Sequence, residues 1–175
     1  KEADVIHLSW INQGMLSLSN IRKILRTGKP VVWTMHDLWP ASAICHLSLG
    51  CNNFKTHCGH CKYLPNGGSS HDLSYQVWKK KEKLYNASNI SFVACSRWLA
   101  NEAKASGLLK NQVVTAIPNP INTQMFNPND KRLARQLCGF PEGKRLILFV
   151  AQRATNVNKG MSYLIEACNQ LTDTY

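Results

Sequence analysis

The sequence lacks a long apolar run, an excess of acidic residues and internal repeats. No stretch of about 18 consecutive apolar residues occurs, so we expect no transmembrane helix. The chain opens with Lys1-Glu2-Ala3-Asp4, without an initiator methionine or the basic and apolar leader of a signal peptide. It ends within a helical pattern. We therefore expect an internal piece of a longer protein.

Acidic residues are few: 10 Asp and Glu stand against 21 Lys and Arg, a formal net charge of +11 in 175 residues. This balance favours anionic partners such as nucleic acid, phosphorylated metabolites or an acidic lipid surface. A basic surface that serves solubility alone is the alternative. The basic residues are spread over several segments, which argues against a single helix that reads nucleic acid. Examples are Arg22, Lys23, Arg26, Lys79 to Lys81, Lys131, Arg132 and Arg135.

Strand and helix patterns alternate along the chain, and 44% of the residues are hydrophobic, which suffices for a core. Apolar and β-branched runs predict strands, and apolar residues at helical spacing predict helices between them. Strands are expected at 4–9, 31–35, 90–95, 113–117 and 146–151. Helices are expected to begin after a cap at Ser17 or Ser19, at Asp72 and at Ser96, and again after residues 129 and 160. This order predicts an α/β fold, a parallel Rossmann-like sheet with helices on both faces.

Two segments interrupt the alternation. Residues 36–71 form a long loop rich in Cys, His, Gly and Asn, and such a loop is usually functional or needs its own staple. Residues 118–129 are rich in Asn and Pro, which predicts a hinge or linker. We therefore expect one domain over 1–117 and the beginning of a second α/β domain over 130–175.

The same patterns predict which side chains are buried. Expected inward are Leu73, Val77, Leu84, Leu133 and Leu137, the strand 146–151, and the free thiols of Cys95, Cys138 and Cys168. Lys79, Lys80, Lys81 and Lys83 are expected to lie mostly outward. They predict a solvated helix face, with contact to anionic lipid as the second interpretation.

His36 and Asp37 directly follow the apolar run 31–35. Polar groups at the carboxyl end of a strand line the ligand site of open α/β sheets, so this pair is a candidate functional site. Near neutral pH, histidine donates or accepts a hydrogen bond with a sugar hydroxyl or a phosphate. The alternative is a structural histidine followed by an aspartate that caps the turn.

Arg153 and Lys159 bracket a loop between the predicted strand 146–151 and the helix that follows Gly160. Arginine offers a fork of donors, lysine offers a point charge, and the helix dipole favours anions. The loop is therefore a candidate diphosphate clamp. The alternative is an exposed loop with two solvated cations.

Four of the seven cysteines lie within the long loop, with the spacing C-x5-C-x6-C-x2-C. They are Cys45, Cys51, Cys58 and Cys61, and His46, His57 and His60 are further candidate ligands. Four thiolates can close a tetrahedral zinc site, which would be structural because a closed shell leaves no position for water. Two disulfides and four free thiols are the alternatives.

A succession of motifs runs through almost the whole chain. They are Asp4-Val5-Ile6-His7, Trp33-Thr34-Met35-His36-Asp37-Leu38-Trp39, Cys45-His46, Cys58-Gly59-x-Cys61, Ser96-Arg97-Trp98-Leu99, Ile117-Pro118-Asn119-Pro120-Ile121-x-Thr123-x-x-Phe126, Phe149-Val150, Lys159-Gly160 and Leu164-Ile165-Glu166-Ala167. Together they resemble the family-4 retaining glycosyltransferases, and most of all the bacterial enzymes of capsule, colanic-acid and O-antigen assembly. The sequence departs from the family pattern at Pro120, which replaces a glycine, and at Asn122, which replaces an aspartate. It also has Ala41-Ser42-Ala43-Ile44 where the subgroup tends to have Thr-Gly-Gly.

The resemblance implies the GT-B architecture, in which two Rossmann-like domains face each other across a cleft. The first domain binds the acceptor, and the second binds the nucleotide-activated sugar. It implies that His36, with Asp37, is catalytic and contacts the donor sugar. The residues implied to bind the donor, with its diphosphate held by the two cations, are Arg153, Lys159, Gly160 and Asn119. Transfer with retention by front-face attack is implied as well.

We therefore expect a glycosyltransferase of the hexosyltransferase type that uses a UDP- or GDP-sugar and a lipid-linked or polysaccharide acceptor. We expect a cytoplasmic protein with peripheral contact to the inner face of an anionic membrane, and no nucleic-acid partner. The chain alone is expected to be inactive, because about half of the cleft is missing. The alternatives are a zinc-stapled basic binding module and a non-catalytic transferase remnant, with which Asn122 is compatible.

Overall fold

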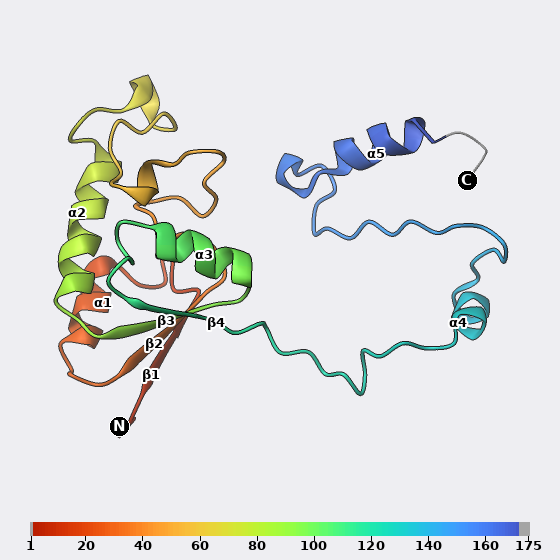
Figure 1. Cartoon of the computed structure of the whole chain (residues 1–175), viewed down its shortest axis with the longest axis horizontal. Helices are drawn as coiled ribbons and strands as arrows, with labels where there is room; N and C mark the ends of the chain where they lie inside the picture. Colours follow the sequence, from red (N-terminus) through yellow and green to blue (C-terminus); the bar gives the residue numbers. More distant parts are fainter. Residues whose placement is uncertain (1, 172–175) are drawn as a thin grey trace. The chain divides into compact units, whose positions relative to one another are not determined.

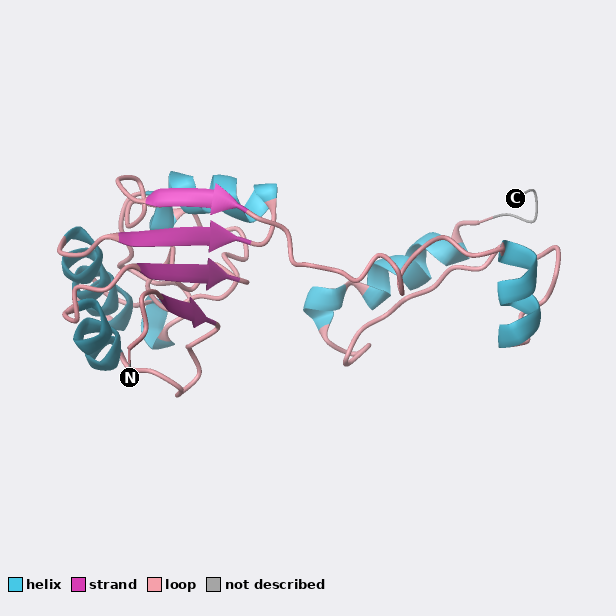
Figure 2. Ribbon diagram, turned by 90° about the horizontal axis from the view of Figure 1, so that it is seen from below, coloured by secondary structure: helices cyan, strands magenta, loops and turns pink. Residues whose placement is uncertain are grey.

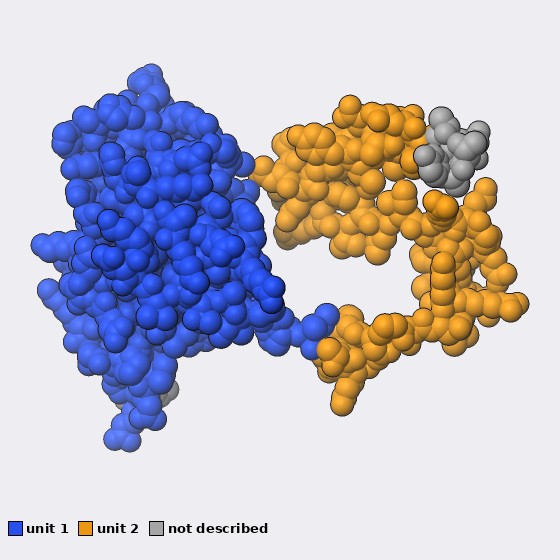
Figure 3. Space-filling view, in the orientation of Figure 1, with its two compact units in different colours: residues 1–121 blue, residues 122–175 orange. Residues whose placement is uncertain are grey.

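The computed structural model describes residues 2–171. The chain divides into two compact units, Lys1–Ile121 (unit 1) and Asn122–Tyr175 (unit 2), shown in Figure 3. The division falls within the Asn- and Pro-rich segment 118–129, whose residues are all exposed. Each unit is described by itself. No helix in the described range 2–171 has the length and apolar character needed to cross a membrane.

Unit 1 is built on a parallel sheet of four strands, as Figures 1 and 2 show. The strands are β1 (Ile6–Ser9), β2 (Val31–Met35), β3 (Ile90–Ala94) and β4 (Val113–Ala116), in the spatial order β1-β2-β3-β4. In this register Trp33 of β2 lies beside Leu8 of β1 and Phe92 of β3. The four strands predicted in this part of the sequence are therefore confirmed.

Three helices connect these strands, and each begins where a polar side chain caps it. They are α1 (Leu18–Leu25), α2 (Leu73–Asn86) and α3 (Arg97–Ala105). Ser17, Asp72 and Ser96 accept hydrogen bonds from the backbone N–H groups of Asn20, Tyr75 and Leu99 at 3.2, 3.0 and 3.1 Å. Such a bond satisfies one of the donors that the first helical turn leaves unpaired. The predicted helix starts are thus confirmed.

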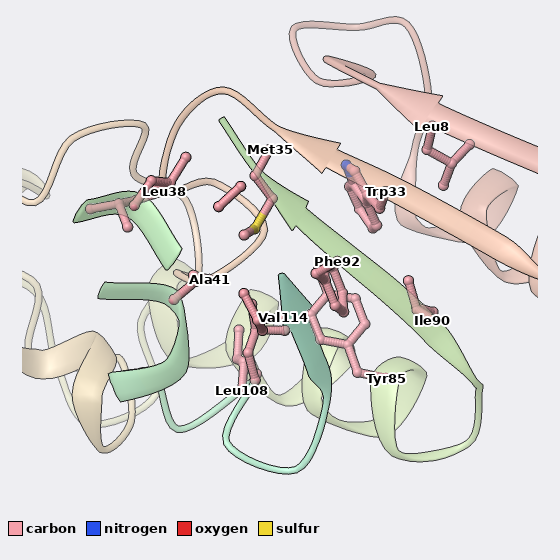
Figure 4. Close-up of a cluster of buried hydrophobic side chains, with 14 of the residues drawn as sticks. Leu8, Trp33, Met35, Leu38, Ala41, Tyr85, Ile90, Phe92, Leu108 and Val114 are labelled. Carbon is pink, nitrogen blue, oxygen red and sulfur yellow. The ribbon is translucent and has the colours of Figure 1, made fainter. Parts of the chain in front are cut away.

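The core of unit 1 is centred on Trp33, which is 1% exposed (Figure 4). Its ring stacks on Phe92 at a centroid distance of 5.7 Å and meets Tyr85 of α2 edge-on at 6.1 Å. Offset and edge-to-face pairs of this kind add to the free energy gained by burying aromatic area. Side chains of β2 alternate in burial, so every second one lies in the core. The polar residues His36 and Asp37 directly follow its carboxyl end.

Helices cover one face of this sheet within residues 2–171, whereas the sequence pattern led us to expect both. Buried side chains of all three helices, Ile21, Tyr85 and Ala103 among them, share one core with Trp33. The opposite face carries exposed polar side chains, including those of His7, Ser9, Ser91 and Thr115. Parallel crossovers are right-handed, and these strands follow one another in sequence order, so each helix reaches the same face. Cover on the second face requires the strand order to reverse.

Helix α2 is rotated relative to the face predicted for it. Leu73 is 54% exposed, whereas Lys81, expected on the outer face, is completely buried. Lys81 lies three residues after Trp78 and four before Tyr85, so helical spacing places it on their buried face. The prediction for Lys81 was wrong because its charge was given more weight than its position.

Unit 2 contains the helices α4 (Lys131–Cys138) and α5 (Met161–Asn169) and the short 3-10 turn η3 (Val157–Lys159). The predicted strand 146–151 is not formed, and Leu148 and Val150 are 85% and 79% exposed. A strand requires hydrogen-bonded neighbours, and unit 2 offers none among its described residues 122–171. For the same reason four side chains predicted to be buried are exposed: Leu133, Leu137, Cys138 and Cys168.

Candidate functional site

The candidate site lies at the carboxyl edge of the unit 1 sheet, where polar residues follow β1 and β2. His36 directly follows β2 and is exposed, and its Nε2 lies 3.2 Å from the hydroxyl of Ser9, the last residue of β1. Parallel strands bring their carboxyl ends to one edge, so the pair arises from residues 27 positions apart. The predicted location of His36 at an open strand end is therefore observed.

Asp37 uses both of its carboxylate oxygens within the protein. Oδ1 accepts the backbone N–H of Trp39 at 2.9 Å, and Oδ2 lies 2.6 Å from Nδ1 of His46. The side-chain amide of Asn12, which follows β1, is 3.1 Å from the same nitrogen. Because Nδ1 is occupied in this way, Nε2 is the nitrogen of His46 that remains for a ligand. The Asp37–His46 pair thus resembles a base held by a carboxylate.

Lys81 fixes the chain just beyond this pair. Its Nζ donates to the backbone carbonyls of Trp39 at 2.5 Å and Ser42 at 2.9 Å, and lies 3.5 Å from the centre of the Trp39 ring. Burial lowers the pKa of the Lys81 ammonium well below its usual range, while the nearby Cys58 and Asp37 side chains oppose that shift. The buried lysine therefore joins α2 to the segment that carries the site.

Two further buried side chains donate hydrogen bonds to the backbone carbonyls that lie between those of Trp39 and Ser42. The hydroxyl of Tyr85 donates to the carbonyl of Pro40 at 3.2 Å, and the hydroxyl of Ser106 donates to that of Ala41 at 2.6 Å. Burial raises the pKa of Tyr85, so it stays a neutral donor. Four successive carbonyls of a buried turn are thus satisfied by side chains, which removes the cost of burying them unpaired.

The loop beyond this turn contains the short 3-10 turns η1 (Asn53–Lys55) and η2 (Pro65–Gly67). Asp72, at the end of this loop, connects it to the start of α2 through hydrogen bonds. The carboxylate of Asp72 accepts hydrogen bonds from the backbone N–H groups of Cys61 at 2.8 Å and Ser69 at 3.2 Å, besides the capping bond from Tyr75. Burial raises the pKa of this carboxyl, but these donors and the Ser74 hydroxyl outweigh burial and hold it below its usual range. Asp72 thus caps a helix and clamps a loop at once.

The four loop cysteines lie within electrostatic reach of one another. Burial raises the pKa of the Cys45 thiol, and Cys61 and Cys51 raise it further. Burial also raises the pKa of Cys58 to about 11; the backbone N–H of Ala43, bonded to its sulfur, opposes this shift, and the other three cysteines reinforce it. The loop therefore gathers residues that are up to 16 positions apart in the sequence.

All four of these cysteines are free thiols. Across residues 2–171, no three His, Cys, Asp or Glu side chains already surround one point as metal ligands do. The predicted zinc site therefore stays a prediction.

The residues predicted to bind the donor lie after β4 and in unit 2. Asn119 is exposed in the segment after β4. Arg153 and Lys159 are also exposed, and Gly160 has a positive φ of 76° at the start of α5. Asn122 accepts the backbone N–H groups at positions 124 and 125 at 3.0 and 3.1 Å, so it performs the capping that an aspartate would perform. The departure at Asn122 thus preserves the local turn.

Sequence reasoning missed two residues of this site. His46 was considered only as a metal ligand, although it pairs with Asp37 nine residues earlier. Lys81 was assigned to a solvated face. The helical spacing of Lys81 from Trp78 was a usable signal, whereas nothing in the sequence indicates that loop residue 46 returns to the strand end.

An open α/β sheet with polar residues at the carboxyl edge defines a protein that binds its ligand at that edge. Comparison with known proteins identifies the family to which the chain belongs. The model of the Glycosyltransferase Family 4 matches residues 1–125, and the chain belongs to this family. The putative colanic acid biosynthesis glycosyl transferase WcaC of Escherichia coli (strain K12) is 29% identical over 104 residues, which cover 55% of this chain. The match covers 25% of that relative. No solved structure matches.

Proposed function

We propose that the protein carrying this sequence transfers a sugar from a UDP- or GDP-sugar to a lipid-linked or polysaccharide acceptor, with retention of configuration. The observation that supports this best is the polar edge of unit 1, where His36 stands exposed beside Ser9 and next to the Asp37–His46 pair. The name of the Escherichia coli relative, a putative colanic acid biosynthesis glycosyl transferase, is in line with a polysaccharide acceptor. We propose that the protein works at the cytoplasmic face of the cell membrane.

In this proposal His36 contacts the donor sugar, and Ser9 positions its ring through the 3.2 Å contact. Asp37 acts through His46 rather than on the substrate, because both of its oxygens are already engaged. The sequence predicted Asp37 as catalytic, and its hydrogen bonds favour a positioning role instead.

Unit 2 would hold the leaving group. Arg153 offers a planar fork to the diphosphate, Lys159 adds a point charge, and Gly160 lets the backbone approach closely at the start of α5. Asn119 is proposed as a further donor-binding residue. The bond between the anomeric carbon and the diphosphate oxygen breaks, the acceptor oxygen forms a bond to the same carbon, and its proton passes to the diphosphate. Positive charge on that group stabilises the transition state.

The test is an assay of nucleoside diphosphate release from UDP- and GDP-sugars by the full-length protein, with a lipid extract of the host membrane as acceptor. We expect His36→Ala to lower kcat/KM by about 100-fold, the effect of removing one preorganised hydrogen-bonding group. His71→Ala is the matched control, since His71 is exposed and contacts Ser70 and Tyr75 away from the site. Equal activity of His36→Ala and the wild type would refute the role of His36. We expect the 175-residue chain alone to show no turnover.

A basic groove between α1 and α2 supports the proposed membrane contact. It encloses about 360 Å³, and its charged lining residues are all cations: Arg22, Arg26, Lys79, Lys80 and Lys83. Cations near an anionic bilayer contribute about 1 kcal/mol each. We expect the chain to sediment with vesicles of phosphatidylglycerol and not with vesicles of phosphatidylcholine, and the variant Lys80→Glu/Lys83→Glu to lose that difference. Equal sedimentation with both vesicles would contradict the contact.

A further inference from the structure

The loop 36–71 is long for a compact domain and has few regular hydrogen bonds of its own. Between β2 and α2 it contains only two 3-10 turns of three residues each. It is nevertheless folded back on itself by side chains. Asn53 Nδ2 donates to the carbonyl of Gly59 at 3.1 Å, and the hydroxyl of Tyr63 donates to that of Leu49 at 2.8 Å. These bonds draw the segments that carry the four cysteines toward one another.

The four thiols in this folded loop are buried or half-buried. Cys61 is 9% exposed, and Cys45, Cys51 and Cys58 are half-buried. The sulfur of Cys58 accepts a hydrogen bond from the backbone N–H of Ala43, two residues before Cys45. Hydrogen bonds from outside the ligand set help to orient the ligands of a metal site. The loop thus supplies the sulfurs and one backbone donor beside them.

We propose that Cys45, Cys51, Cys58 and Cys61 bind one zinc ion as four thiolate ligands in a structural site. Zinc prefers four tetrahedral ligands, and the C-x2-C pair formed by Cys58 and Cys61 has the spacing of a zinc knuckle. Binding deprotonates the thiols and ties three separate parts of the loop to one point. The inference goes beyond the proposed function, because the ion takes no part in sugar transfer.

The charge of such a site is balanced by the protein around it. Four thiolates around a divalent cation leave a net charge of −2, which is costly to bury without a nearby cation. Lys81 of α2 lies close enough to affect Cys45, and negative charge on Cys58 and Cys45 opposes the effect of burial on the charged lysine. It also fixes the backbone at Ser42, one residue before the Ala43 N–H group that bonds to Cys58. A buried lysine beside four cysteines is thereby explained.

The experiment measures the zinc content of the purified chain by mass spectrometry and the absorption spectrum of the cobalt-substituted chain. We expect one equivalent of zinc, and the thiolate-to-cobalt charge-transfer and intense visible bands of a tetrahedral sulfur site. Cys58→Ser should lose both signals. The matched controls Cys95→Ser, Cys138→Ser and Cys168→Ser, which change cysteines outside the loop, should retain both.

A second measurement covers the case in which Cys58→Ser does not fold. Zinc is removed from the wild-type chain under reducing conditions and titrated back. We expect saturation at one equivalent, together with an increase in protease resistance of residues 36–71. Absence of zinc with no uptake on titration overturns the proposal, and so does a mass that shows two disulfides among the four loop cysteines. Because these readouts involve no sugar substrate, their failure would leave the transferase proposal standing.

Discussion

Two apolar segments of this chain, both predicted to be strands, differ in the structure. Val31–Met35 forms the central strand β2, hydrogen-bonded to β1 on one side and β3 on the other, with every second side chain buried. Residues 146–151 are as apolar, yet they form no strand, and most of them are exposed. The difference shows that an apolar run becomes a strand only where neighbouring strands satisfy its backbone. It separates unit 1, which has a sheet and a core, from unit 2, whose described residues 122–171 have helices without a sheet.

The largest change in stability should come from a substitution in β2. We expect Trp33→Ala to lower the free energy of unfolding by about 3–5 kcal/mol, because it removes a fully buried aromatic side chain from the core. Leu148→Ala in unit 2 should change it by less than about 0.5 kcal/mol, since the side chain is exposed. Urea denaturation followed by far-UV circular dichroism measures both. Equal effects at the two positions would show that 146–151 is packed in solution.

A second contrast lies within α2, between the buried Lys81 and the exposed Lys80. Lys81→Met leaves the carbonyls of Trp39 and Ser42 buried without their donor, and we expect a loss of about 2–3 kcal/mol. Lys80→Met should be within about 0.5 kcal/mol of the wild type. The same denaturation experiment compares them. Equal stability of the two variants would mean that the carbonyls find other partners.

The two aspartate caps offer a smaller contrast between the units. Asp72 of unit 1 accepts four hydrogen bonds, whereas Asp130 of unit 2 accepts one, from the N–H of Leu133 at 2.7 Å. We expect Asp72→Ala to lower the melting temperature more than Asp130→Ala, because it releases a loop as well as a helix end. Differential scanning calorimetry of the two variants measures this difference.

The effect of Asp72 should also depend on pH. Its pKa is lowered in the folded chain, so its stabilisation is fully present above the ordinary pKa of aspartate, 3.8, and is lost as the pH falls through the lowered value. The gap between the wild type and Asp72→Ala should therefore narrow below about pH 4. A gap that widens as the pH falls would contradict the assignment.

Much of unit 1 could be predicted from local patterns. Apolar runs located β1 to β4, and helical spacing located α1 to α3. The caps at Ser17, Asp72 and Ser96 marked the helix starts. These signals could be used because they involve neighbouring residues. Which face the helices cover depends on strand order, and that order is not written in any one segment. The same holds for 146–151, whose local pattern is satisfactory and whose partners are missing from the described part of unit 2.

The site divides in the same way. His36 and Asp37 could be placed at a strand end, because their position follows from the strand that precedes them. The pairing of Asp37 with His46 could not be predicted from the sequence. It depends on the path of the loop, which is fixed by Lys81, Tyr85 and Ser106 from distant parts of the chain. Long-range contacts of this kind decide the geometry of a loop site.

The central claim is that the edge of unit 1 presents a pre-formed polar site in which Asp37 and His46 act as one group. The most direct measurement is a double-mutant cycle on kcat/KM for sugar transfer by the full-length protein, with Asp37→Asn and His46→Gln. We predict that each substitution alone lowers kcat/KM. The double variant should have a kcat/KM no lower than that of the less active single variant. Two independent losses that multiply in the double variant, or single variants as active as the wild type, would contradict the account.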